Sequence, residues 1–232
     1  MVISLSRRTA LLLAAFLFPA GLSAWAASRV PVAFQAEDGV VVRGWVWPGG
    51  RAAVILSHMF GTDQSVWTDL AGLLAARGYT VLTYDFRGVG RSGGRLVIAE
   101  VDRDVLAAIR HVRGRGARRV VLIGASMGGT ASLVAAARAP VHGVVVMASG
   151  TQFAGLNARP HLPGLRVPKL FIVGSGDQPF HDSARYMHRV TPPPKHLLVL
   201  PTPAHGTYML RTRHRAAIEA AILDFLKRYA GS

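Results

Sequence analysis

The sequence predicts an α/β fold with a mostly parallel central sheet of about eight strands, an antiparallel N-terminal hairpin and helices on both faces. Two observations support it. Beyond residue 50, short apolar runs alternate with segments of helical period. Before residue 50, two β-rich runs flank the turn signal Glu37-Asp38-Gly39. Because no repeat or linker divides residues 27–232, we expect one domain there.

Each element is justified by its local pattern. The hairpin strands are expected at residues 30–35 and 40–47, on either side of the turn. The later strands are continuous apolar runs, which is typical of strands buried on both faces of a parallel sheet. We place them at residues 52–57, 79–84, 120–123, 141–148, 169–173 and 196–200.

Helices are expected between these strands, where apolar residues recur at helical spacing. We place them at residues 66–77, 98–112, 127–138, 180–190 and 214–229. The pattern lapses at residues 150–167, where Pro, Gly and mixed residues follow one another. That stretch is short for a connection that carries a cap domain, so we expect a minimal cap.

Composition limits the classes of function. The chain has 232 residues, 50% of them hydrophobic, which suits one domain with a well-buried core. The absence of cysteine excludes disulfides, thiolate metal sites and a cysteine nucleophile. The net charge of +15 comes from 24 Arg and 3 Lys against 12 acidic residues. Because the arginines are scattered, they resemble a coding bias more than a nucleic-acid footprint, and we predict no nucleic-acid partner.

The one dense basic cluster is residues 110–119, which lies between two apolar segments. We interpret it as a solvated turn. Binding to nucleic acid or to an anionic surface is the alternative, and it predicts retention on heparin that falls steeply with salt.

The N-terminal residues 1–26 are typical of a secretory signal peptide. They contain a basic pair, an apolar run, helix breakers and small residues, namely Arg7, Arg8, residues 10–18, Pro19, Gly21, Ala24 and Ala26. We predict cleavage after Ala26, a periplasmic or secreted location and no stable membrane insertion after cleavage. Twin-arginine (Tat) and Sec export both remain open. An uncleaved membrane anchor is the alternative, although the apolar run is short for one.

Residues 120–129 contain the motif on which the prediction of function depends. They form an apolar run that ends in Gly124-Ala125-Ser126-Met127-Gly128 and opens into an Ala-rich helix. A strand, sharp turn and helix place Ser126 at the tip of the turn. The turn needs small neighbours because the strand and the helix pass close together. Since such a motif also arises by chance, its meaning depends on partners elsewhere in the chain.

Several further motifs follow in a characteristic order. They are Ser57-His58-Met59-Phe60-Gly61, Tyr84-Asp85-Phe86-Arg87-Gly88-Val89-Gly90-Arg91-Ser92, Gly174-Ser175-Gly176-Asp177 and Ala204-His205-Gly206. Together with the Ser126 motif they resemble the α/β-hydrolase superfamily over essentially the whole mature chain. The resemblance is to its small, nearly lidless, esterase- or dienelactone-hydrolase-like serine hydrolases. It implies a nucleophile, acid and base at Ser126, Asp177 and His205, in that chain order.

The chemistry explains these residue types. A serine hydroxyl needs a neutral imidazole to take its proton, and His205 lies in a loop after the last predicted strand. Asp177 follows a strand at the carboxyl end of the sheet, where open α/β folds bind their ligands. Asp182 is the alternative acid, and Asp85 is interpreted as a residue that organises its loop. The rival histidines are less well placed: His181, His188, His196 and His214.

The oxyanion of the tetrahedral intermediate needs two backbone N–H donors. One is expected at Met127, the residue after the nucleophile. The resemblance assigns the other to Phe60, with Met59 as the fallback. Met59 stands where the family usually has glycine, which leaves the conformation of that loop open. We expect His58 to be a structural hydrogen-bonding residue.

We therefore predict an enzyme that cleaves a carboxylic ester or thioester of a small acyl substrate through a Ser126 acyl-enzyme. An amidase or peptidase of the same fold, or a catalytically idle hydrolase-like binding protein, is the alternative. An acyl pocket or ordinary core is expected to contain Phe60, Trp67, Met127, Phe153 and Met209. The histidines and carboxylates show no metal-ligand spacing, and the Gly-rich loop at residues 88–94 lacks a P-loop pattern. No cofactor or metal is expected.

Overall fold

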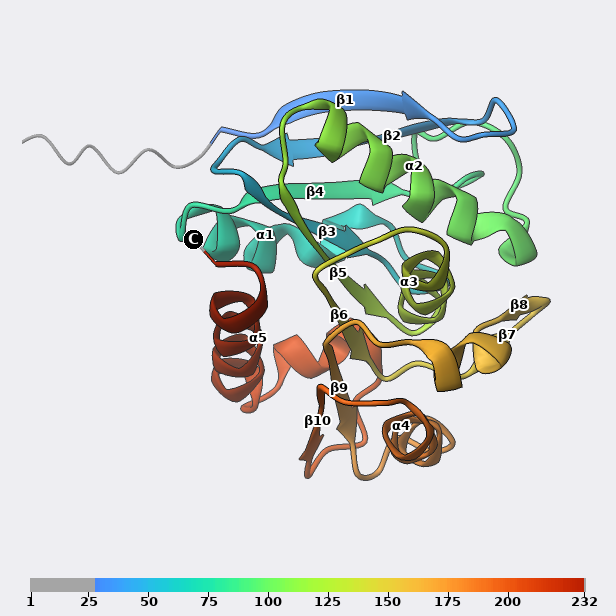
Figure 1. The fold of residues 1–232 in the computed structure, drawn as a ribbon, viewed down its shortest axis with the longest axis vertical. Helices are drawn as coiled ribbons and strands as arrows, with labels where there is room; N and C mark the ends of the chain where they lie inside the picture. Colours follow the sequence, from blue (N-terminus) through green and yellow to red (C-terminus); the bar gives the residue numbers. More distant parts are fainter. Residues whose placement is uncertain (1–27, 232) are drawn as a thin grey trace, which may run out of the picture.

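The main sheet has eight strands in the order β1-β2-β4-β3-β5-β6-β9-β10 (Figure 1). The computed structural model describes residues 28–231, so the predicted signal peptide lies outside the described residues. The strands are β1 Val30–Gln35, β2 Val41–Trp47, β3 Ala52–Ser57, β4 Thr80–Asp85, β5 Arg119–Ala125, β6 Gly143–Met147, β9 Lys169–Gly174 and β10 Lys195–Leu200.

Strand direction follows the predicted fold class. β1 and β2 form an antiparallel hairpin, β2 is antiparallel to β4, and every other neighbouring pair is parallel. This arrangement confirms the predicted α/β fold. β3 and β5 pair with Ser57 opposite Gly124, so their carboxyl ends stop at the same height. The two loops that follow these strands, after Ser57 and at Ser126, therefore begin side by side.

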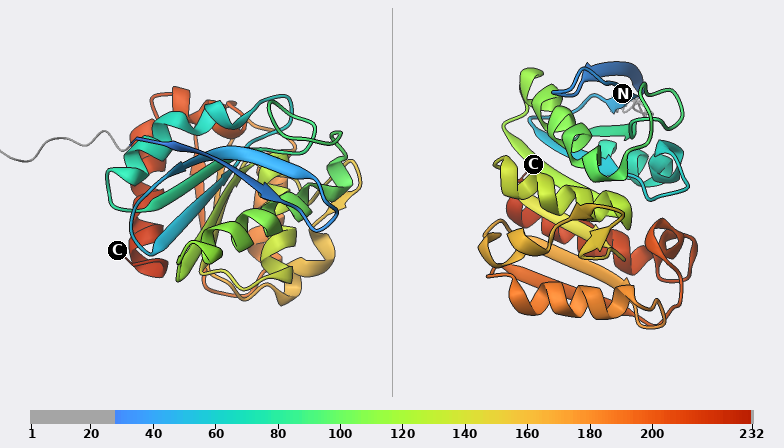
Figure 2. Two further views of the ribbon diagram at one scale, coloured as in Figure 1. Left: turned by 90° about the horizontal axis from the view of Figure 1, so that it is seen from above. Right: turned by 90° about the vertical axis from the view of Figure 1, so that its right-hand side faces the viewer.

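Helices cover both faces of the sheet (Figure 2). They are α1 Thr68–Ala75, α2 Val101–Gly114, α3 Met127–Arg138, α4 Phe180–Val190 and α5 Arg215–Tyr229. α1 and α5 lie on one face, and α2, α3 and α4 lie on the other. Strands β3, β5 and β6 have almost no exposed residue because helices cover them on both sides, which explains their continuous apolar sequences. Within residues 28–231, no helix has the length and apolarity needed to cross a bilayer.

Two helices differ from their predicted bounds. The first begins as a 3₁₀ turn, η1 Gln64–Trp67, because the Asp63 carboxylate accepts a hydrogen bond from the Ser65 N–H and caps the chain there. α2 follows a short 3₁₀ turn, η2 Ile98–Glu100, and continues to Gly114. The helix thus extends two residues beyond its predicted end at residue 112, and the first half of the basic cluster at residues 110–119 is helical instead of part of the predicted turn.

Residues 150–167 form a minimal cap. They contain a hairpin of β7 Gln152–Phe153 and β8 Leu156–Asn157, followed by the 3₁₀ helix η3 Arg159–Gly164. The Thr130 hydroxyl donates to the Gly150 carbonyl at 2.8 Å, which anchors the start of this segment to α3. The segment therefore lies next to α3 and does not form a separate domain.

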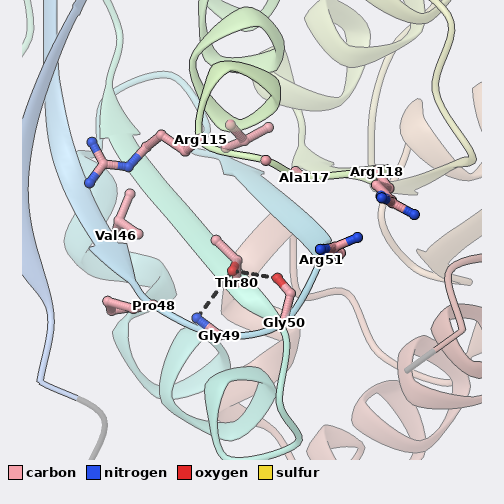
Figure 3. A pocket seen from close by; sticks show the side chains of 11 residues that line it. Val46, Pro48, Gly49, Gly50, Arg51, Thr80, Arg115, Ala117 and Arg118 are labelled. Atoms are coloured by element: carbon pink, nitrogen blue, oxygen red, sulfur yellow. Dashed lines mark hydrogen bonds between the residues drawn. The ribbon is translucent and has the colours of Figure 1, made fainter.

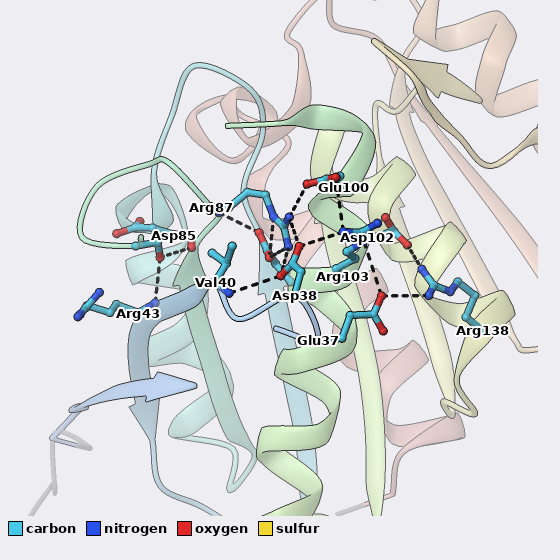
Figure 4. A network of polar contacts seen from close by, with 12 residues as sticks. Glu37, Asp38, Val40, Arg43, Asp85, Arg87, Glu100, Asp102, Arg103 and Arg138 are labelled. Carbon is cyan, nitrogen blue, oxygen red and sulfur yellow. Dashed lines mark hydrogen bonds and ion pairs between the residues drawn. The ribbon is translucent and has the colours of Figure 1, made fainter. Parts of the chain in front are cut away.

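A buried ion cluster holds the Gly-rich loop after β4 in place (Figure 4). Arg87 is only 1% exposed, and its guanidinium binds Asp104, Asp38 and Glu100 at 2.7, 2.7 and 2.8 Å. These carboxylates come from α2, the β1–β2 turn and the η2 turn. The hydrogen bond from Arg87 lowers the pKa of Asp38 to about 2. One guanidinium thus joins three segments that are far apart in sequence.

Candidate active site

Ser126 occupies a strained turn between β5 and α3. Its φ of 50° and ψ of −118° lie in a region of backbone conformation that residues other than glycine rarely adopt. A Cβ added at Gly124 would overlap the backbone of Gly128, and one added at Gly128 would overlap the Ser57 and His58 carbonyls. Both glycines are needed because the strand and the helix approach each other this closely. The Ser126 side chain is partly exposed at the tip of the turn.

The same close approach places the start of α3 against the β3 loop. Met127 is the first residue of α3, so its N–H has no intrahelical acceptor. Within residues 28–231, this N–H donates to no backbone carbonyl outside the helix either. Since Gly128 contacts the carbonyls of Ser57 and His58, the free N–H of Met127 lies beside the loop that continues to Phe60.

His58 is a structural residue in this loop. Its Nε2 accepts a hydrogen bond from the Phe86 N–H at 3.1 Å, so the proton is on Nδ1. Nδ1 then donates to the Met59 carbonyl at 2.9 Å. Burial lowers the pKa of His58, which keeps the ring neutral. The structure thus gives His58 the hydrogen-bonding role that the sequence suggested.

These bonds orient the peptide between Met59 and Phe60. The Met59 carbonyl accepts hydrogen bonds from the His58 ring and from the Thr62 hydroxyl, each at 2.9 Å. In a planar trans peptide, the next N–H points opposite to the carbonyl. The Phe60 N–H therefore points away from both donors, and in the described chain it has no backbone partner.

Met59 shows how the loop tolerates a methionine in place of glycine. Its side chain is buried, and its sulfur accepts a hydrogen bond from the Thr207 hydroxyl at 3.6 Å. Gly206 leaves room for it, because a Cβ there would stand 2.7 Å from the Met59 sulfur. The substitution thus packs the β3 loop against the loop that carries His205.

His205 and Asp177 form a hydrogen-bonded pair. The His205 Nδ1 lies 2.9 Å from Asp177 Oδ2 and 3.2 Å from Oδ1. Asp177 follows β9 and its side chain is 7% exposed. Burial raises the pKa of Asp177, whereas the hydrogen bond from His205 lowers it. The alternative acid, Asp182, is 74% exposed and lies 3.5 Å from His181, so the structure pairs His205 with Asp177.

The His205 loop lies against the turn that carries Ser126. A Cβ at Gly206 would stand 3.6 Å from the Cβ of Ala125, the residue before the serine. The Phe180 ring packs on the His205 ring with centroids 4.2 Å apart. Among the described residues, no hydrogen bond joins the Ser126 hydroxyl to His205. Sequence reasoning missed Phe180 because nothing in its helix marks it as a neighbour of His205.

The other histidines lie in different surroundings. His188 packs edge-on against Phe171, His196 faces Tyr229, and His214 contacts the Pro201 carbonyl. Asp85 has the loop-organising role expected of it. Its carboxylate accepts hydrogen bonds from the backbone N–H groups of Gln64 and Arg91, at 3.0 and 3.3 Å.

The aromatic residues and methionines predicted for an acyl pocket or core fall into a buried group and an exposed group. Trp67, Met127 and Met209 are buried, as the core interpretation requires. Phe60 and Phe153 are 51% and 37% exposed, and their rings meet edge-on with centroids 5.5 Å apart. This contact joins the β3 loop to the β7–β8 hairpin and leaves an apolar rim on the surface. Within residues 28–231, no three His, Asp or Glu side chains gather as a potential metal site.

Comparison with known proteins places the chain among α/β-hydrolases. The family described as "Serine aminopeptidase, S33" matches residues 49–169. The uncharacterized protein YfhR of Escherichia coli (strain K12) is 26% identical over 238 residues, covering 89% of this chain and 82% of YfhR. The polyketide transferase af380 of Aspergillus fumigatus is 29% identical over 119 residues, covering 47% of this chain and 41% of that protein.

Solved structures share the fold at low sequence identity. The Pyrococcus furiosus esterase Pf2001 is 20% identical with a TM-score of 0.75, covering 88% of this chain and 91% of the esterase. The enol-lactonase of Burkholderia xenovorans LB400 is 18% identical with a TM-score of 0.70, covering 84% of this chain and 99% of the lactonase.

Proposed function

Because this chain belongs to the serine aminopeptidase S33 family of α/β-hydrolases, we propose that it cleaves carboxylic esters or thioesters through an acyl-enzyme on Ser126. One observation carries the proposal. Ser126 stands on a strained turn, and the loop packed against that turn holds His205 hydrogen-bonded to the buried Asp177. A nucleophile, a base and an orienting carboxylate in this arrangement are the parts of acyl transfer by a serine.

In the first half of the reaction, the Ser126 oxygen attacks the substrate carbonyl carbon while Nε2 of His205 takes the hydroxyl proton. Asp177 holds the Nδ1 proton of the ring, so Nε2 is the free base. The tetrahedral intermediate then expels the alcohol or thiol, which receives the proton from His205. Ser126 is left as an ester of the acyl group.

In the second half, His205 takes a proton from water as the water oxygen attacks the acyl-enzyme. Collapse of the second intermediate returns the proton to Ser126 and releases the carboxylic acid. Asp177 stabilises the charged imidazolium in both halves without taking up the proton itself.

The negative oxygen of each intermediate would be bound by the N–H groups of Met127 and Phe60. Two observations support this assignment. The Met127 N–H is free at the start of α3, and the Met59 carbonyl is held by His58 and Thr62 so that the Phe60 N–H points the other way. Donors fixed before the reaction cost no reorganisation when the charge develops.

An ester substrate fits the surroundings better than a peptide with a free amino terminus. Buried charges are paired in proteins, so a peptide buried with a free amino terminus would need a carboxylate beside its ammonium group. Of the two buried carboxylates at these loops, Asp177 is paired with His205 and Asp85 with backbone N–H groups. The rim formed by Phe60 and Phe153 is apolar, which suits an acyl chain. The esterase and the enol-lactonase that share the fold act on ester bonds by their names, which agrees with this choice.

Covalent labelling tests the proposal. We expect a fluorophosphonate probe to label the purified protein at Ser126 and p-nitrophenyl acetate to be hydrolysed. The Ser126→Ala variant should show neither reaction. A parallel assay with alanine p-nitroanilide tests the peptidase alternative, and we expect no Ser126-dependent cleavage of this amide.

A folded control makes the result decisive. Ser132→Ala changes a serine of the same helix whose hydroxyl bonds to the Gly128 carbonyl, away from the turn, and should retain labelling and turnover. If the folded wild-type protein is not labelled and hydrolyses no faster than Ser126→Ala, the chain is a hydrolase-like binding protein instead.

A further inference from the structure

A cavity lies at the edge of the sheet opposite the candidate active site. Its volume is about 540 Å³, and it opens where β2 ends and β3 and β4 begin. Its walls come from Val46, residues 48–51, Thr80, the end of α2 and the turn after it (Figure 3). Ser126 and His205 follow the carboxyl ends of the strands, so this cavity is separate from the hydrolase site. The inference below does not depend on the proposed hydrolase activity.

Three arginines line this arginine cavity, and no acidic residue does. Arg51, Arg115 and Arg118 are all among its lining residues. Arg115 stands on one side of the cavity, and Arg51 and Arg118 stand together on another (Figure 3). The sequence itself creates this imbalance, because it has no Asp or Glu at residues 39–62 or at residues 105–176.

The carboxylates that could neutralise these cations are engaged elsewhere. In the described chain, the arginines paired with carboxylates are Arg87, Arg103, Arg138, Arg215 and Arg228. The cavity arginines make none of the ion pairs found within residues 28–231. Their guanidinium charges therefore remain available to a ligand.

The cavity is shaped before any ligand binds. The Arg118 N–H donates to the Arg51 carbonyl at 2.8 Å, which holds two like-charged residues next to each other. The Thr80 hydroxyl donates to the Gly50 carbonyl and accepts from the Gly49 N–H, at 2.8 and 3.1 Å. Both bonds fix the loop that carries Arg51. Two arginines that make no ion pair in the described chain and whose backbones are held side by side at one cavity favour the binding of an anion.

Nearby arginines lower the pKa of two histidines. Burial lowers the pKa of His111, and the positive charge of Arg115 lowers it further. Burial also lowers the pKa of His142, followed by the charges of Arg119 and Arg113. Arg115 of the cavity thus acts on His111, whereas the arginines that act on His142 lie outside the cavity lining.

We propose that the arginine cavity binds a phosphate-bearing anion. Guanidinium groups bind phosphate through paired N–H donors, and three of them match a ligand with more than one charge. The cavity volume falls in the range of sites for small organic ligands, so the phosphate belongs to a larger molecule. That molecule is either a soluble phosphate compound or the headgroup of an anionic phospholipid.

The test compares two double variants with equal loss of charge. Arg115→Gln/Arg118→Gln removes one guanidinium from each side of the cavity. Arg95→Gln/Arg213→Gln removes two exposed arginines that belong neither to the cavity nor to the candidate active site. The soluble arm measures binding of inorganic pyrophosphate by calorimetry. The lipid arm measures co-sedimentation with vesicles of phosphatidylcholine, with and without phosphatidylglycerol.

We expect wild-type protein and the Arg95/Arg213 variant to bind at least one of these probes, and the Arg115/Arg118 variant to bind it at least about tenfold more weakly. Loss in the pyrophosphate arm alone identifies a soluble phosphate ligand, and loss in the phosphatidylglycerol arm identifies a headgroup. Equal binding by both double variants, or no binding of either probe by the wild-type protein, overturns the proposal. All three proteins should keep the same melting temperature and the same p-nitrophenyl acetate turnover.

Discussion

The two edges of the sheet treat charge in opposite ways. At the carboxyl edge, charged and polar side chains bind one another: Asp177 binds His205, and Arg87 binds Asp104, Asp38 and Glu100. At the amino edge, the arginines of the cavity have no carboxylate partner within the described chain, and the buried Lys169 at the start of β9 has only carbonyl partners. The carboxyl edge is where the backbone strain at Ser126 is found.

Because of this difference in charge pairing, the carboxyl edge is suited to chemistry on a substrate and the amino edge to binding an anion. Paired groups fix positions to a fraction of an ångström, which chemistry on a substrate requires. They are also sensitive to change, because losing one partner leaves the other buried and unpaired. Unpaired cations fix little, but they attract anions over a distance of several ångströms. We therefore expect substitutions to have large effects at the carboxyl edge and small effects at the amino edge.

The largest effect is expected from Asp177→Asn. The amide keeps the shape of the side chain but no longer holds the Nδ1 proton of His205 as a carboxylate does. We expect kcat for p-nitrophenyl acetate to fall about 10⁴-fold with the fold intact. Asp182→Asn, on the exposed alternative acid, should leave kcat unchanged. If the two variants behave the other way round, Asp182 is the acid.

A large effect on stability is expected from Arg87→Met. The substitution leaves Asp104, which is fully buried, without its cation, at a cost of about 3–5 kcal/mol in the free energy of unfolding. The melting temperature should fall by about 10 °C. Arg103→Met removes a partly exposed arginine of the same cluster and should cost much less, because solvent screens exposed ion pairs.

A second change separates the loss of the cation from the loss of packing at this cluster. Adding Asp104→Leu to Arg87→Met should restore part of the stability, since it removes the unpaired carboxylate. Equal unfolding energies for Arg87→Met and Arg103→Met would show that the buried cluster is no more sensitive than an exposed pair.

An effect confined to alkaline pH is expected at the amino edge, from the titration of Lys169. Burial lowers the pKa of Lys169 to about 8, followed by the charge of Lys195. Between pH 8 and about 10.5 the unfolded chain binds more protons at this lysine than the folded chain, so its contribution to stability rises with pH. The slope is at most about 1.4 kcal/mol per pH unit.

Urea denaturation at several pH values measures this contribution. Lys169→Met removes the titrating group but leaves every other ionisable residue in place. The unfolding energy of the wild-type protein should therefore rise relative to that of Lys169→Met across this window. Parallel curves would show that Lys169 titrates normally in the folded protein.

Much of the fold could be predicted from local patterns. Apolar runs such as residues 120–123 and 141–148 are continuous because helices cover both faces of the sheet, and the strands β5 and β6 lie there. Helix ends were less predictable. The basic cluster at residues 110–119 looked like one turn, yet α2 continues through its first half, because a helix packed on the sheet tolerates arginines on its exposed side.

The candidate site could be predicted only in part. A Gly-x-Ser-x-Gly motif marks Ser126 because close packing requires its glycines, and that requirement is local. The sequence favoured Asp177 over Asp182 as the acid, but only the three-dimensional structure shows which of the two pairs with His205, since both follow β9 within a few residues. The contact of Phe180 with His205 left no trace in the sequence, because apolar residues contact many kinds of neighbour.

The sequence by itself determined the order of strands and helices, the turn at Ser126 and the excess of arginine over acid, because these depend on residues near one another or on composition. Only the tertiary structure decided which charges meet. Arg87 finds carboxylates from three distant segments, whereas Arg51 and Arg118 come together with none. The physical reason is that electrostatic interactions depend on distance in space, and chain folding alone sets that distance.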